Sequence, residues 1–591
     1  MDNIKELPQP FGFYRYILKA DHLHFGLWPA ESPGLSFESA QENMFSHLLS
    51  FFPPAPAAIL DVGCGLGYAA FLLSSKGYSV TAIAPSSELI EYARKEYGNS
   101  GVRFEALGFF DEDKIVFESG RYDVIFFQES VQYLRPLDSV IRKARDLLKD
   151  NGLIIIGDEV SYAADVKSQT AVHPAVDFTV ALSENGFRIT ENGKIGKNVI
   201  PTCEFIIREF TKNAEAIISA FPGDRTREEL SFFLEGWKKQ KEWYESAKFG
   251  YEIFVAKKDS FFIRPYSTGD ERAILPMFNE VFKVNRTPDH WLWKFRDNPY
   301  GSYKISLAFT ENSRLVAHYA GYTAPFHSTV DGMKSFLSYQ IGDTMTSPSV
   351  RNIGLGKTGL LARTANHFYA KFCKDTIPFI YGFNTGHIKK LGMRYLGYSY
   401  IDPVTFWTKD LSKTSFITPS FIRRFFGGYS VEEVGSLSEE WTLFFENVCD
   451  NYKFLVRRDA KYLTWRYLNC PDKVHRIFEV RKRGRLVGWS VFASQEKKII
   501  WGDALFDRHF PEAPQYLLNS LFVNEFSGRE SVEGWFSRHP DWWSRQLEGL
   551  GFQMAPEPNS LVPCFVVFDD PSIIETLRNY FYYTMGDSDL F

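Results

Sequence analysis

The feature that most constrains this chain is a glycine-rich turn directly after an apolar run. Ile59-Leu60-Asp61-Val62-Gly63-Cys64-Gly65-Leu66-Gly67 has the pattern of a buried strand that breaks into a turn with glycine at every second position. Helix-forming sequence follows at once from Tyr68. Glycine lets the backbone adopt a positive φ and lets a ligand approach the main chain closely. A strand, a glycine turn and a helix in this order predict a nucleotide-type cofactor site in an α/β domain.

The segments after this turn predict a parallel, doubly wound sheet. Apolar runs typical of buried strands occur at Tyr78–Ile83, Tyr122–Phe127 and Gly152–Gly157. Amphipathic stretches typical of helices separate them at Ser87–Tyr97 and Leu137–Lys149. Strands and helices that alternate in this way build a parallel sheet with helices on both faces. A Rossmann-like α/β domain is therefore expected over residues 1–258, with Gly250–Lys258 as its last strand.

The glycine turn resembles the first motif of class I S-adenosylmethionine-dependent methyltransferases, which reads D-x-G-x-G-x-G. The resemblance implies that S-adenosyl-L-methionine is the cofactor, with its methionine part on the turn and its amino group near Asp61. Many family members hold the ribose hydroxyls with an acid where this chain has Ala84, so Ser86 or the backbone would replace it. The implied cofactor residues are Asp61, Gly63, Cys64, Gly65, Gly67, Ala84, Pro85, Ser86 and Gln128.

The pocket for the methyl acceptor is expected beyond the carboxyl ends of the strands. Glu129 and Tyr133 follow the fourth strand and Glu159 follows the fifth, so all three are candidates to bind the acceptor or take its proton. His24 lies in an aromatic segment before the turn that either caps the cofactor, together with Tyr14 and Trp28, or only packs on the core helix. The helical insert at 225–247 is expected to cover this pocket.

A second unit is expected to begin near Phe261, with a strand and then an amphipathic helix. The loop Val350-Arg351-Asn352-Ile353-Gly354-Leu355-Gly356-Lys357 lies between the strand-like Leu337–Thr346 and a long helix at Gly359–Phe372. Small residues at a helix N-terminus expose amide groups, which attract a diphosphate together with the helix dipole. The arrangement resembles GNAT acetyltransferases, whose loop reads R/Q-x-x-G-x-G/A, and implies acetyl-CoA or another acyl-CoA as cofactor. The alternative is an ordinary helix entry that contains glycine.

Further residues of this second unit fit the resemblance less uniformly. Asn384 follows the apolar strand Ile377–Phe383, where GNAT proteins commonly have an asparagine beside the pantetheine arm. Many members use a tyrosine to protonate the leaving thiolate, but Met393 stands at that spacing, which leaves Tyr398 or Tyr395. Asp343 is the candidate base on the strand before the loop, and a solvated strand acid is the equally weighted alternative.

An internal repeat indicates a duplication in the C-terminal half. The segments that begin at Trp293 and Trp465 share a tryptophan, a basic residue, an aromatic residue, a proline at +6 and a later Arg-Leu-Val. The predicted domains are a GNAT-like acyltransferase at 259–410, a linker at 411–429 and a degenerate GNAT-like domain at 430–591. The loop counterpart at 507–513 has no glycine, so the second domain is expected to bind no coenzyme A.

Composition limits the classes of partner. A net charge of −5 gives no electrostatic footprint for nucleic acid. The beginning of the chain has no apolar signal core, and no apolar run approaches the ~20 residues that a membrane span needs. Six cysteines lie far apart without a C-x-x-C pair, which argues against a zinc site or a disulfide framework and fits the cytoplasm. The oligomeric state stays open.

Together these patterns predict a bifunctional transferase that acts on small molecules. The expected reactions are S-adenosylmethionine-dependent methylation of a small molecule, such as an amino sugar or amino acid derivative, and acyl-CoA-dependent N-acylation. No metal ion is expected. The alternative is a methyltransferase whose GNAT-like half is a non-catalytic module that binds the substrate.

Overall fold

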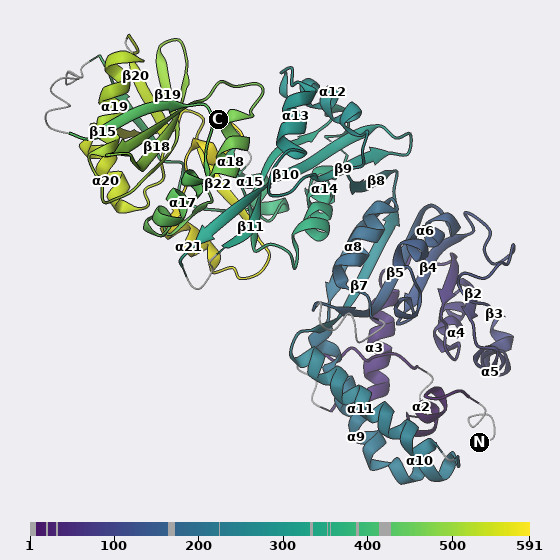
Figure 1. Cartoon of the computed structure of the whole chain (residues 1–591). Helices are drawn as coiled ribbons and strands as arrows, with labels where there is room; N and C mark the ends of the chain where they lie inside the picture. Colours follow the sequence, from purple (N-terminus) through teal and green to yellow (C-terminus); the bar gives the residue numbers. More distant parts are fainter. Residues whose placement is uncertain are drawn as a thin grey trace. The chain divides into compact units, whose positions relative to one another are not determined.

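The chain folds into two compact units, Met1–Arg264 and Pro265–Phe591 (Figure 1). The structure is a computed structural model, and it describes residues 7–18, 22–30, 34–163, 172–223, 225–330, 335–351, 353–354, 356–385, 389–412, 427–526 and 528–591. Within these ranges no helix is both long enough and apolar enough to cross a membrane.

The N-terminal unit is built on one seven-stranded sheet with the order β3-β2-β1-β4-β5-β7-β6. Its strands are β1 Ala58–Val62, β2 Ser79–Ala84, β3 Arg103–Ala106, β4 Tyr122–Gln128, β5 Leu148–Ser161, β6 Phe187–Lys194 and β7 Phe249–Lys258. Strands β1 to β5 are parallel, and β7 runs antiparallel between β5 and β6. The doubly wound α/β fold predicted for this region is confirmed. The strand order reverses at β1, and ligands of such sheets bind at the carboxyl ends of the strands at this point.

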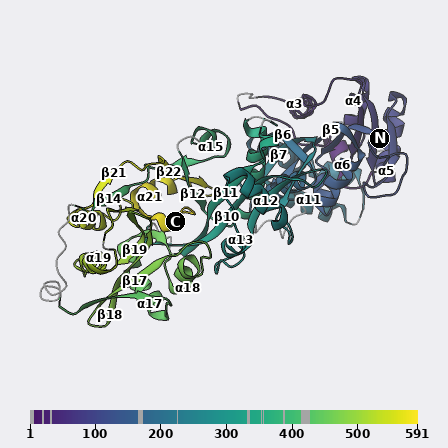
Figure 2. The same cartoon turned by 90° about the horizontal axis from the view of Figure 1, so that it is seen from above.

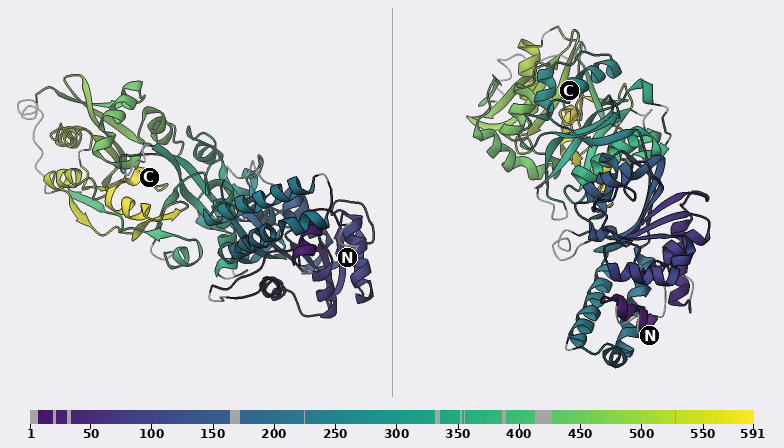
Figure 3. Two further views of the ribbon diagram at one scale, coloured as in Figure 1. Left: turned by 90° about the horizontal axis from the view of Figure 1, so that it is seen from below. Right: turned by 90° about the vertical axis from the view of Figure 1, so that its right-hand side faces the viewer.

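Helices cover both faces of this sheet because both faces of each central strand are apolar (Figure 3). Ile59 and Val124 contribute to one core, and their neighbours Leu60 and Ile125 contribute to the other. Helices α9, α10 and α11 pack together, with α2 against α10 (Figure 1). The helices are α2 Phe11–Leu18, α3 Phe37–Leu49, α4 Tyr68–Ser75, α5 Ser87–Tyr97, η1 Gly98–Ser100, η2 Val131–Tyr133, α6 Leu137–Leu147, α8 Ala175–Glu184, α9 Gly196–Lys212, α10 Ala214–Ala220 and α11 Thr226–Glu245.

The C-terminal unit contains two sheets. One has the order β13-β22-β12-β11-β10-β16-β23 with β9 also beside β10, and the other has the order β15-β17-β18-β19-β20-β14-β21. After β8 Phe261–Pro265, the strands are β9 Lys304–Thr310, β10 Leu315–Ser328, β11 Ser335–Thr346, β12 Phe379–Thr385, β13 Ser399–Tyr400, β14 Phe406–Asp410, β15 Tyr429–Val434, β16 Phe454–Val456, β17 Arg476–Lys482, β18 Arg485–Ser494, β19 Lys498–Phe506, β20 Ser531–Trp535, β21 Gln553–Ala555, β22 Leu561–Val567 and β23 Phe581–Tyr582.

The helices of this unit are short. They are α12 Glu271–Phe282, α13 Pro288–Phe295, η3 Pro348–Val350, η4 Gly356–Thr358, α14 Leu360–Phe368, η5 Tyr369–Cys373, α15 Lys389–Tyr395, α17 Glu439–Val448, η6 Cys449–Asn451, α18 Ala460–Leu463, η7 Thr464–Leu468, α19 Ala513–Asn524, α20 Asp541–Gly549, α21 Ile573–Tyr580 and η8 Met585–Asp587. The long helix expected from Gly359 is α14 followed by the π-helical turn η5.

Two repeats of six strands exchange their last strands. The first repeat is β9 to β14 and the second is β17 to β22. In both repeats the second, third and fourth strands are neighbours in the sheet, in that order. Strand β22 of the second repeat pairs antiparallel with β12 and β13 of the first, and β14 pairs in the same way with β20 and β21 (Figure 2). The domain limits expected near 411–429 stay predictions, and residues 413–426 lie outside the described ranges.

Equivalent side chains of the two repeats lie face to face. The rings of Trp293 and Trp465 stack with their centroids 5.4 Å apart. Trp293 Nε1 donates to the carbonyl oxygen of Trp465 at 2.6 Å, and Trp465 Nε1 donates to that of Trp293 at 2.8 Å. Such a reciprocal pair is what an isologous interface between two like halves produces.

The strand exchange predicts that the first repeat does not fold alone. A chain that ends at residue 412 lacks β22, which pairs with every residue of β12. An unpaired apolar strand edge promotes aggregation. We expect a fragment of residues 259–412 to aggregate, and co-expression with residues 427–591 to yield a soluble complex in size-exclusion chromatography. A monomeric, cooperatively unfolding first fragment would contradict this.

Candidate functional site

The three glycines of the turn after β1 have different surroundings. Gly63, Gly65 and Gly67 all have positive φ, at 80°, 55° and 88°. A Cβ atom at Gly63 would come within 2.5 Å of Ser130 Cβ, and one at Gly67 within 2.7 Å of Ala93 Cβ. At Gly65 the nearest atom would be Leu23 Cδ1 at 3.5 Å. An added Cβ atom would therefore point at the protein from Gly63 and Gly67, whereas from Gly65 it would point into free space.

Polar groups at this turn are left for a ligand. The amides of Gly63 and Cys64 both donate to the carbonyl of Ile83, but those of Gly65 and Leu66 donate to no group of the described chain. Asp61 Oδ2 is buried without a hydrogen-bond partner in the same set of residues, and burial raises the pKa of this carboxyl to about 7. A cationic amino group would pair with this oxygen, so the turn fits the amino acid part of S-adenosylmethionine.

The remaining residues expected to bind this cofactor lie at the ends of β2 and β4. Ala84 is buried at the end of β2 and Pro85 is exposed. Ser86 is engaged as the N-cap of α5, where its hydroxyl accepts from the Leu89 amide and donates to Glu88 Oε2 at 2.7 Å. Glu88 thus places a carboxylate at this turn, and the family pattern of an acid at the end of the strand does not mark it because it lies in the first turn of α5. Gln128 Nε2 is buried with no partner among the described residues.

The surroundings of the turn also shift the pKa of its cysteine, Cys64. Desolvation at this partly buried position and the neighbouring Asp61 carboxylate raise the pKa of the Cys64 thiol well above its usual range. The thiol therefore stays protonated and is not a nucleophile at neutral pH.

Two glutamates of the predicted acceptor pocket hold fixed positions. Glu129 Oε1 accepts from the Phe25 amide at 2.9 Å and from the Tyr251 hydroxyl at 3.0 Å. Glu159 Oε1 accepts from Gln240 Nε2 at 2.5 Å and from the Tyr244 hydroxyl at 2.9 Å. Burial raises the pKa of Glu159 to about 7 and that of Glu129 well above its usual range. The Glu159 carboxyl group could therefore exchange a proton near neutral pH.

Tyr133 lies near these acids and is exposed. The residue is 75% exposed, and partial desolvation together with the nearby carboxyl groups of Glu159, Asp158 and Glu129 raises the pKa of its hydroxyl to about 12. The hydroxyl therefore stays protonated and can donate a hydrogen bond to an acceptor. Three further groups around the glutamates, from α11 and β7, were not predicted: Gln240, Tyr244 and Tyr251. They lie 81 to 122 residues from their partners, and no local pattern marks them.

The aromatic segment before the glycine turn is mostly engaged in packing. Both ring nitrogens of His24 have partners, the carbonyl oxygen of Phe25 at 2.8 Å and His22 Nδ1 at 2.9 Å, and burial lowers the pKa of His24 to about 4. A neutral ring with both nitrogens bonded is a poor general base. Trp28 Nε1 donates to Thr202 Oγ1 at 2.9 Å, and Tyr14 OH accepts from Trp237 Nε1 at 3.1 Å.

The loop before α14 in the C-terminal unit retains open amides. Gly354 and Gly356 have positive φ, 70° and 69°, and their amides donate to no backbone carbonyl of the described chain. Arg351 Nε donates to the Thr346 carbonyl at 3.2 Å, and the Ile353 amide donates to Val350. Lys357 lies in η4, and the predicted loop residues Asn352 and Leu355 are outside the described residues.

Strands β11 and β12 diverge beside this loop. Although they have 12 and 7 residues, they pair only at Tyr339–Ile380 and Gln340–Tyr381. Asn384 lies on β12 beyond the last pair, and its Nδ2 atom is buried without a partner in the described part of the chain. An open strand edge with an unsatisfied amide fits the amide-rich pantetheine arm of coenzyme A.

The structure argues against a proton-transfer role for Asp343. Its buried carboxylate pairs with Arg286, whose Nη2 lies 3.1 Å from Oδ1, and with Lys294 Nζ at 2.9 Å. These cations hold the pKa of Asp343 far below its usual range despite burial, so it remains ionised and does not take up a proton. The second repeat, which lacks the glycine loop, has the same pair between Arg458 and Asp503, with Nε and Oδ1 3.0 Å apart. A pair present in both repeats is structural.

Tyr398 is also unsuited to the role expected for it. Its hydroxyl hydrogen-bonds to Tyr319 OH at 2.9 Å inside an apolar cluster, and its side chain is 8% exposed. Burial raises its pKa far above neutrality. Tyr395 is different, since its ring lies against Gly356 of the loop, 2.9 Å from where a Cβ atom would stand.

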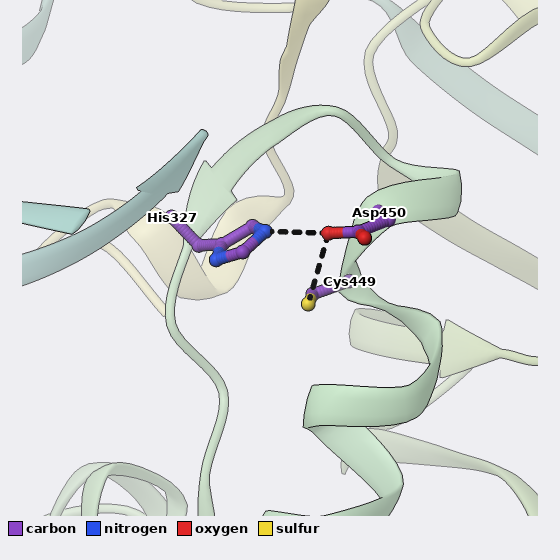
Figure 4. A group of neighbouring side chains, drawn as sticks. All are labelled: His327, Cys449 and Asp450. Carbon is purple, nitrogen blue, oxygen red and sulfur yellow. Dashed lines mark hydrogen bonds and ion pairs between the residues drawn. The ribbon is translucent and has the colours of Figure 1, made fainter. Parts of the chain in front are cut away.

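One group of metal-ligand side chains occurs in the described ranges. His327 at the end of β10 lies beside Cys449 and Asp450 of η6, with the ligand atoms within 4.8 Å of one another (Figure 4). His327 Nε2 lies 2.9 Å from Asp450 Oδ1, and Cys449 Sγ donates to the same oxygen at 3.7 Å. Burial and the nearby carboxylates raise the pKa of Cys449 to about 12. The three groups satisfy one another, and this protonated thiol is not poised to bind a metal ion.

Comparison with known proteins agrees with these geometries. Residues 56–247 match the family model of a methyltransferase domain, and residues 262–396 match that of an acetyltransferase (GNAT) domain. An O-methyltransferase of Pyrenophora dematioidea is 29% identical over 203 residues, which cover 32% of this chain and 75% of that protein. The 27-O-demethylrifamycin SV methyltransferase of Amycolatopsis mediterranei is 25% identical over 259 residues, 41% of this chain and 91% of that protein.

A third relative matches over a shorter stretch. The ubiquinone biosynthesis O-methyltransferase of Xanthomonas axonopodis pv. citri is 28% identical over 129 residues, 22% of this chain and 54% of that protein. This chain therefore spans about half of that relative's length. The matches to these methyltransferases cover at most 41% of this chain. The chain thus joins a methyltransferase domain, at residues 56–247, to a GNAT acetyltransferase domain, at residues 262–396.

Proposed function

We propose that the N-terminal unit methylates a small-molecule acceptor with S-adenosylmethionine. The observation that carries this proposal is the open face of Gly65, with its unpaired amide, beside the unpaired carboxylate oxygen of Asp61. Bound there, the cofactor would supply an electrophilic methyl group on a sulfonium. Tyr133, Glu129 and Glu159 lie at the ends of the neighbouring strands, where they would position the acceptor and take its proton.

The test uses the purified full chain. Calorimetry with S-adenosylmethionine and with S-adenosylhomocysteine measures cofactor binding. Mass spectrometry of reactions with a panel of small amines and hydroxyl compounds measures methylated product and S-adenosylhomocysteine. Absence of binding of both compounds would reject the proposal.

A second proposed activity is acyl transfer from acyl-CoA to an amine by the GNAT domain. The divergence of β11 and β12 beside the unpaired Asn384 amide favours it. An intermediate that is both methylated and N-acylated would explain why the two domains share a chain. In the competing proposal the GNAT half only recruits the acceptor, and the unsuited positions of Asp343 and Tyr398 favour that view.

Acetyl-CoA binding to the full chain separates the two proposals. We expect Arg351→Ala to weaken acetyl-CoA binding by about tenfold, because one hydrogen bond from a charged group is worth about 1.5 kcal/mol. Arg508→Ala is the matched control, since Arg508 is exposed in the corresponding loop of the second repeat, which lacks glycine. If the unaltered protein does not bind acetyl-CoA in calorimetry, the recruiting module is favoured.

A further inference from the structure

The acceptor site proposed for the methyltransferase contains three carboxyl groups without a cationic partner among the described residues. Glu129, Asp158 and Glu159 lie together, and Asp158 and Glu159 are only 1% and 5% exposed. Within the described residues none of the three forms an ion pair with Lys, Arg or His. Buried carboxylates are normally paired with a cation, because an unpaired buried charge costs several kcal/mol.

Each glutamate keeps one oxygen available. Oε1 of Glu129 and of Glu159 takes all the hydrogen bonds that these side chains make with the described residues, and Oε2 accepts none. Neither Oε2 atom is fully enclosed, since neither is among the buried atoms that lack a partner. Water can therefore reach both free oxygens. Tyr133 is exposed and lies near both glutamates, since their charges act on its hydroxyl.

Aromatic rings pack together around the two glutamates. The ring of Phe25 lies 5.4 Å from that of Trp237, and 6.0 Å from those of Tyr244 and Tyr251. The hydroxyls of the two tyrosines are the groups that hold Glu159 and Glu129. Aromatic faces attract cations, and aromatic cages recognise quaternary and methylated ammonium groups.

We propose that the methyl acceptor enters this site as an ammonium ion beside Glu129 and Glu159, whose surroundings are the aromatic side chains of Phe25, Trp237, Tyr244 and Tyr251. The inference rests on the proposed methyl transfer and names the class of its acceptor. A cation pairs with these carboxyl groups and favours their ionised forms, whereas a neutral hydroxyl compound does neither.

Methyl transfer to this acceptor involves one proton transfer and one displacement at the methyl carbon. The ammonium nitrogen loses a proton to the free oxygen of Glu159, and its lone pair forms the new N–C bond to the methyl group. The C–S bond breaks and its electron pair stays on sulfur, which leaves S-adenosylhomocysteine and an alkylammonium product. Positive charge moves from sulfur to nitrogen during transfer, and the carboxylates favour the charge at its new position.

The first experiment measures charge preference with the full chain. The protein is loaded with S-adenosylhomocysteine, whose sulfur is uncharged, and matched probes are titrated by calorimetry: choline against 3,3-dimethylbutan-1-ol, and ethanolamine against 1-propanol. We expect at least one cation to bind about tenfold or more tightly than its neutral isostere, a difference of 1.4 kcal/mol. Equal binding in both pairs, or no binding, would overturn the inference.

The pH dependence gives a second readout. The charged and titratable groups around Glu159 are Glu129 and Asp158 from the strand ends, Tyr133 from η2, Tyr14 from α2, Cys203 from α9, Tyr244 from α11 and Tyr251 from β7. The tyrosines and the cysteine have raised pKa values and stay neutral up to pH 8. Burial raises the pKa of Glu159 to about 7 and that of Asp158 to about 8, so both carboxyl groups ionise as the pH rises from 6 to 8. Since only the ionised forms attract a cation, affinity for the cation rises about tenfold or more over this range, whereas affinity for the isostere stays constant.

Variants connect the preference to the carboxylates. Glu159→Gln and Glu129→Gln are each expected to reduce the cation preference by tenfold or more, while Glu228→Gln, on an exposed position of α11, leaves it unchanged. If a pocket variant fails to fold, the pH dependence of the unaltered protein still decides. S-adenosylhomocysteine binding separates the two proposals: if it binds and no cation is preferred, only the acceptor class is wrong; if it does not bind, both fail.

Discussion

Gly65→Leu is expected to abolish S-adenosylmethionine binding while the N-terminal unit stays folded. A Cβ atom added to Gly65 would meet only Leu23 Cδ1, at 3.5 Å. The leucine side chain therefore enters the space that the ligand needs rather than the core. A leucine at positive φ also strains the backbone by about 1–2 kcal/mol. We expect calorimetry to show affinity reduced by at least ~100-fold, which corresponds to about 2.7 kcal/mol.

Gly120→Leu is the matched control for that strain. Gly120 has φ 67°, close to the 55° of Gly65, and no atom lies within 4 Å of its Cβ direction. This variant should lose similar stability in thermal unfolding and retain cofactor binding. Gly67→Leu should instead unfold the unit, because its side chain would meet Ala93 and Phe104. Normal binding by Gly65→Leu would show that the cofactor does not use this turn.

Asp343→Ala is expected to destabilise the C-terminal unit by about 3–5 kcal/mol, because it leaves the buried cations Arg286 and Lys294 without their shared carboxylate. Asp503→Ala removes the equivalent partner of Arg458 in the second repeat and should cost a similar amount. The measurement is thermal or urea unfolding of the full chain, followed by the tryptophan fluorescence of the C-terminal unit. Binding of S-adenosylhomocysteine provides the control that the N-terminal unit remains folded.

The two aspartates together distinguish structure from catalysis. Because only the first repeat has the glycine loop, a catalytic Asp343 would lose acyl transfer at unchanged stability, and Asp503→Ala would be silent. Equal destabilisation by the two variants supports the structural role. A stable, inactive Asp343→Ala protein would restore the role expected from the sequence.

The local elements around the cofactor turn were predictable from sequence. Helix α5 matches its predicted limits, Ser87–Tyr97, and strand β4 extends the predicted Tyr122–Phe127 by one residue. Such elements depend on the spacing of apolar residues within about ten positions. The turn was predictable for the same reason, because glycine itself permits the positive φ found at Gly63, Gly65 and Gly67.

The partners of buried charges were not predictable. Asp343 is paired with Arg286 and Lys294, which lie 57 and 49 residues away, so its carboxylate cannot serve as the expected base. His24 has both ring nitrogens bonded within its own segment. The spacing of these residues in the sequence places them near a site, but it does not show which groups form ion pairs and hydrogen bonds with them.

By itself, the sequence determined where the backbone turns, which strands are buried and where two cofactor loops begin, because each is encoded by residues that are neighbours in the chain. Only the tertiary structure decided that β14 and β22 are exchanged between the two sheets, and that Asp343 is paired with cations. It also decided that Glu129 and Glu159 have no cationic partner among the described residues. The physical reason is that a buried charge or an open strand edge is satisfied by whichever segment packs against it, and that segment can lie a hundred residues away.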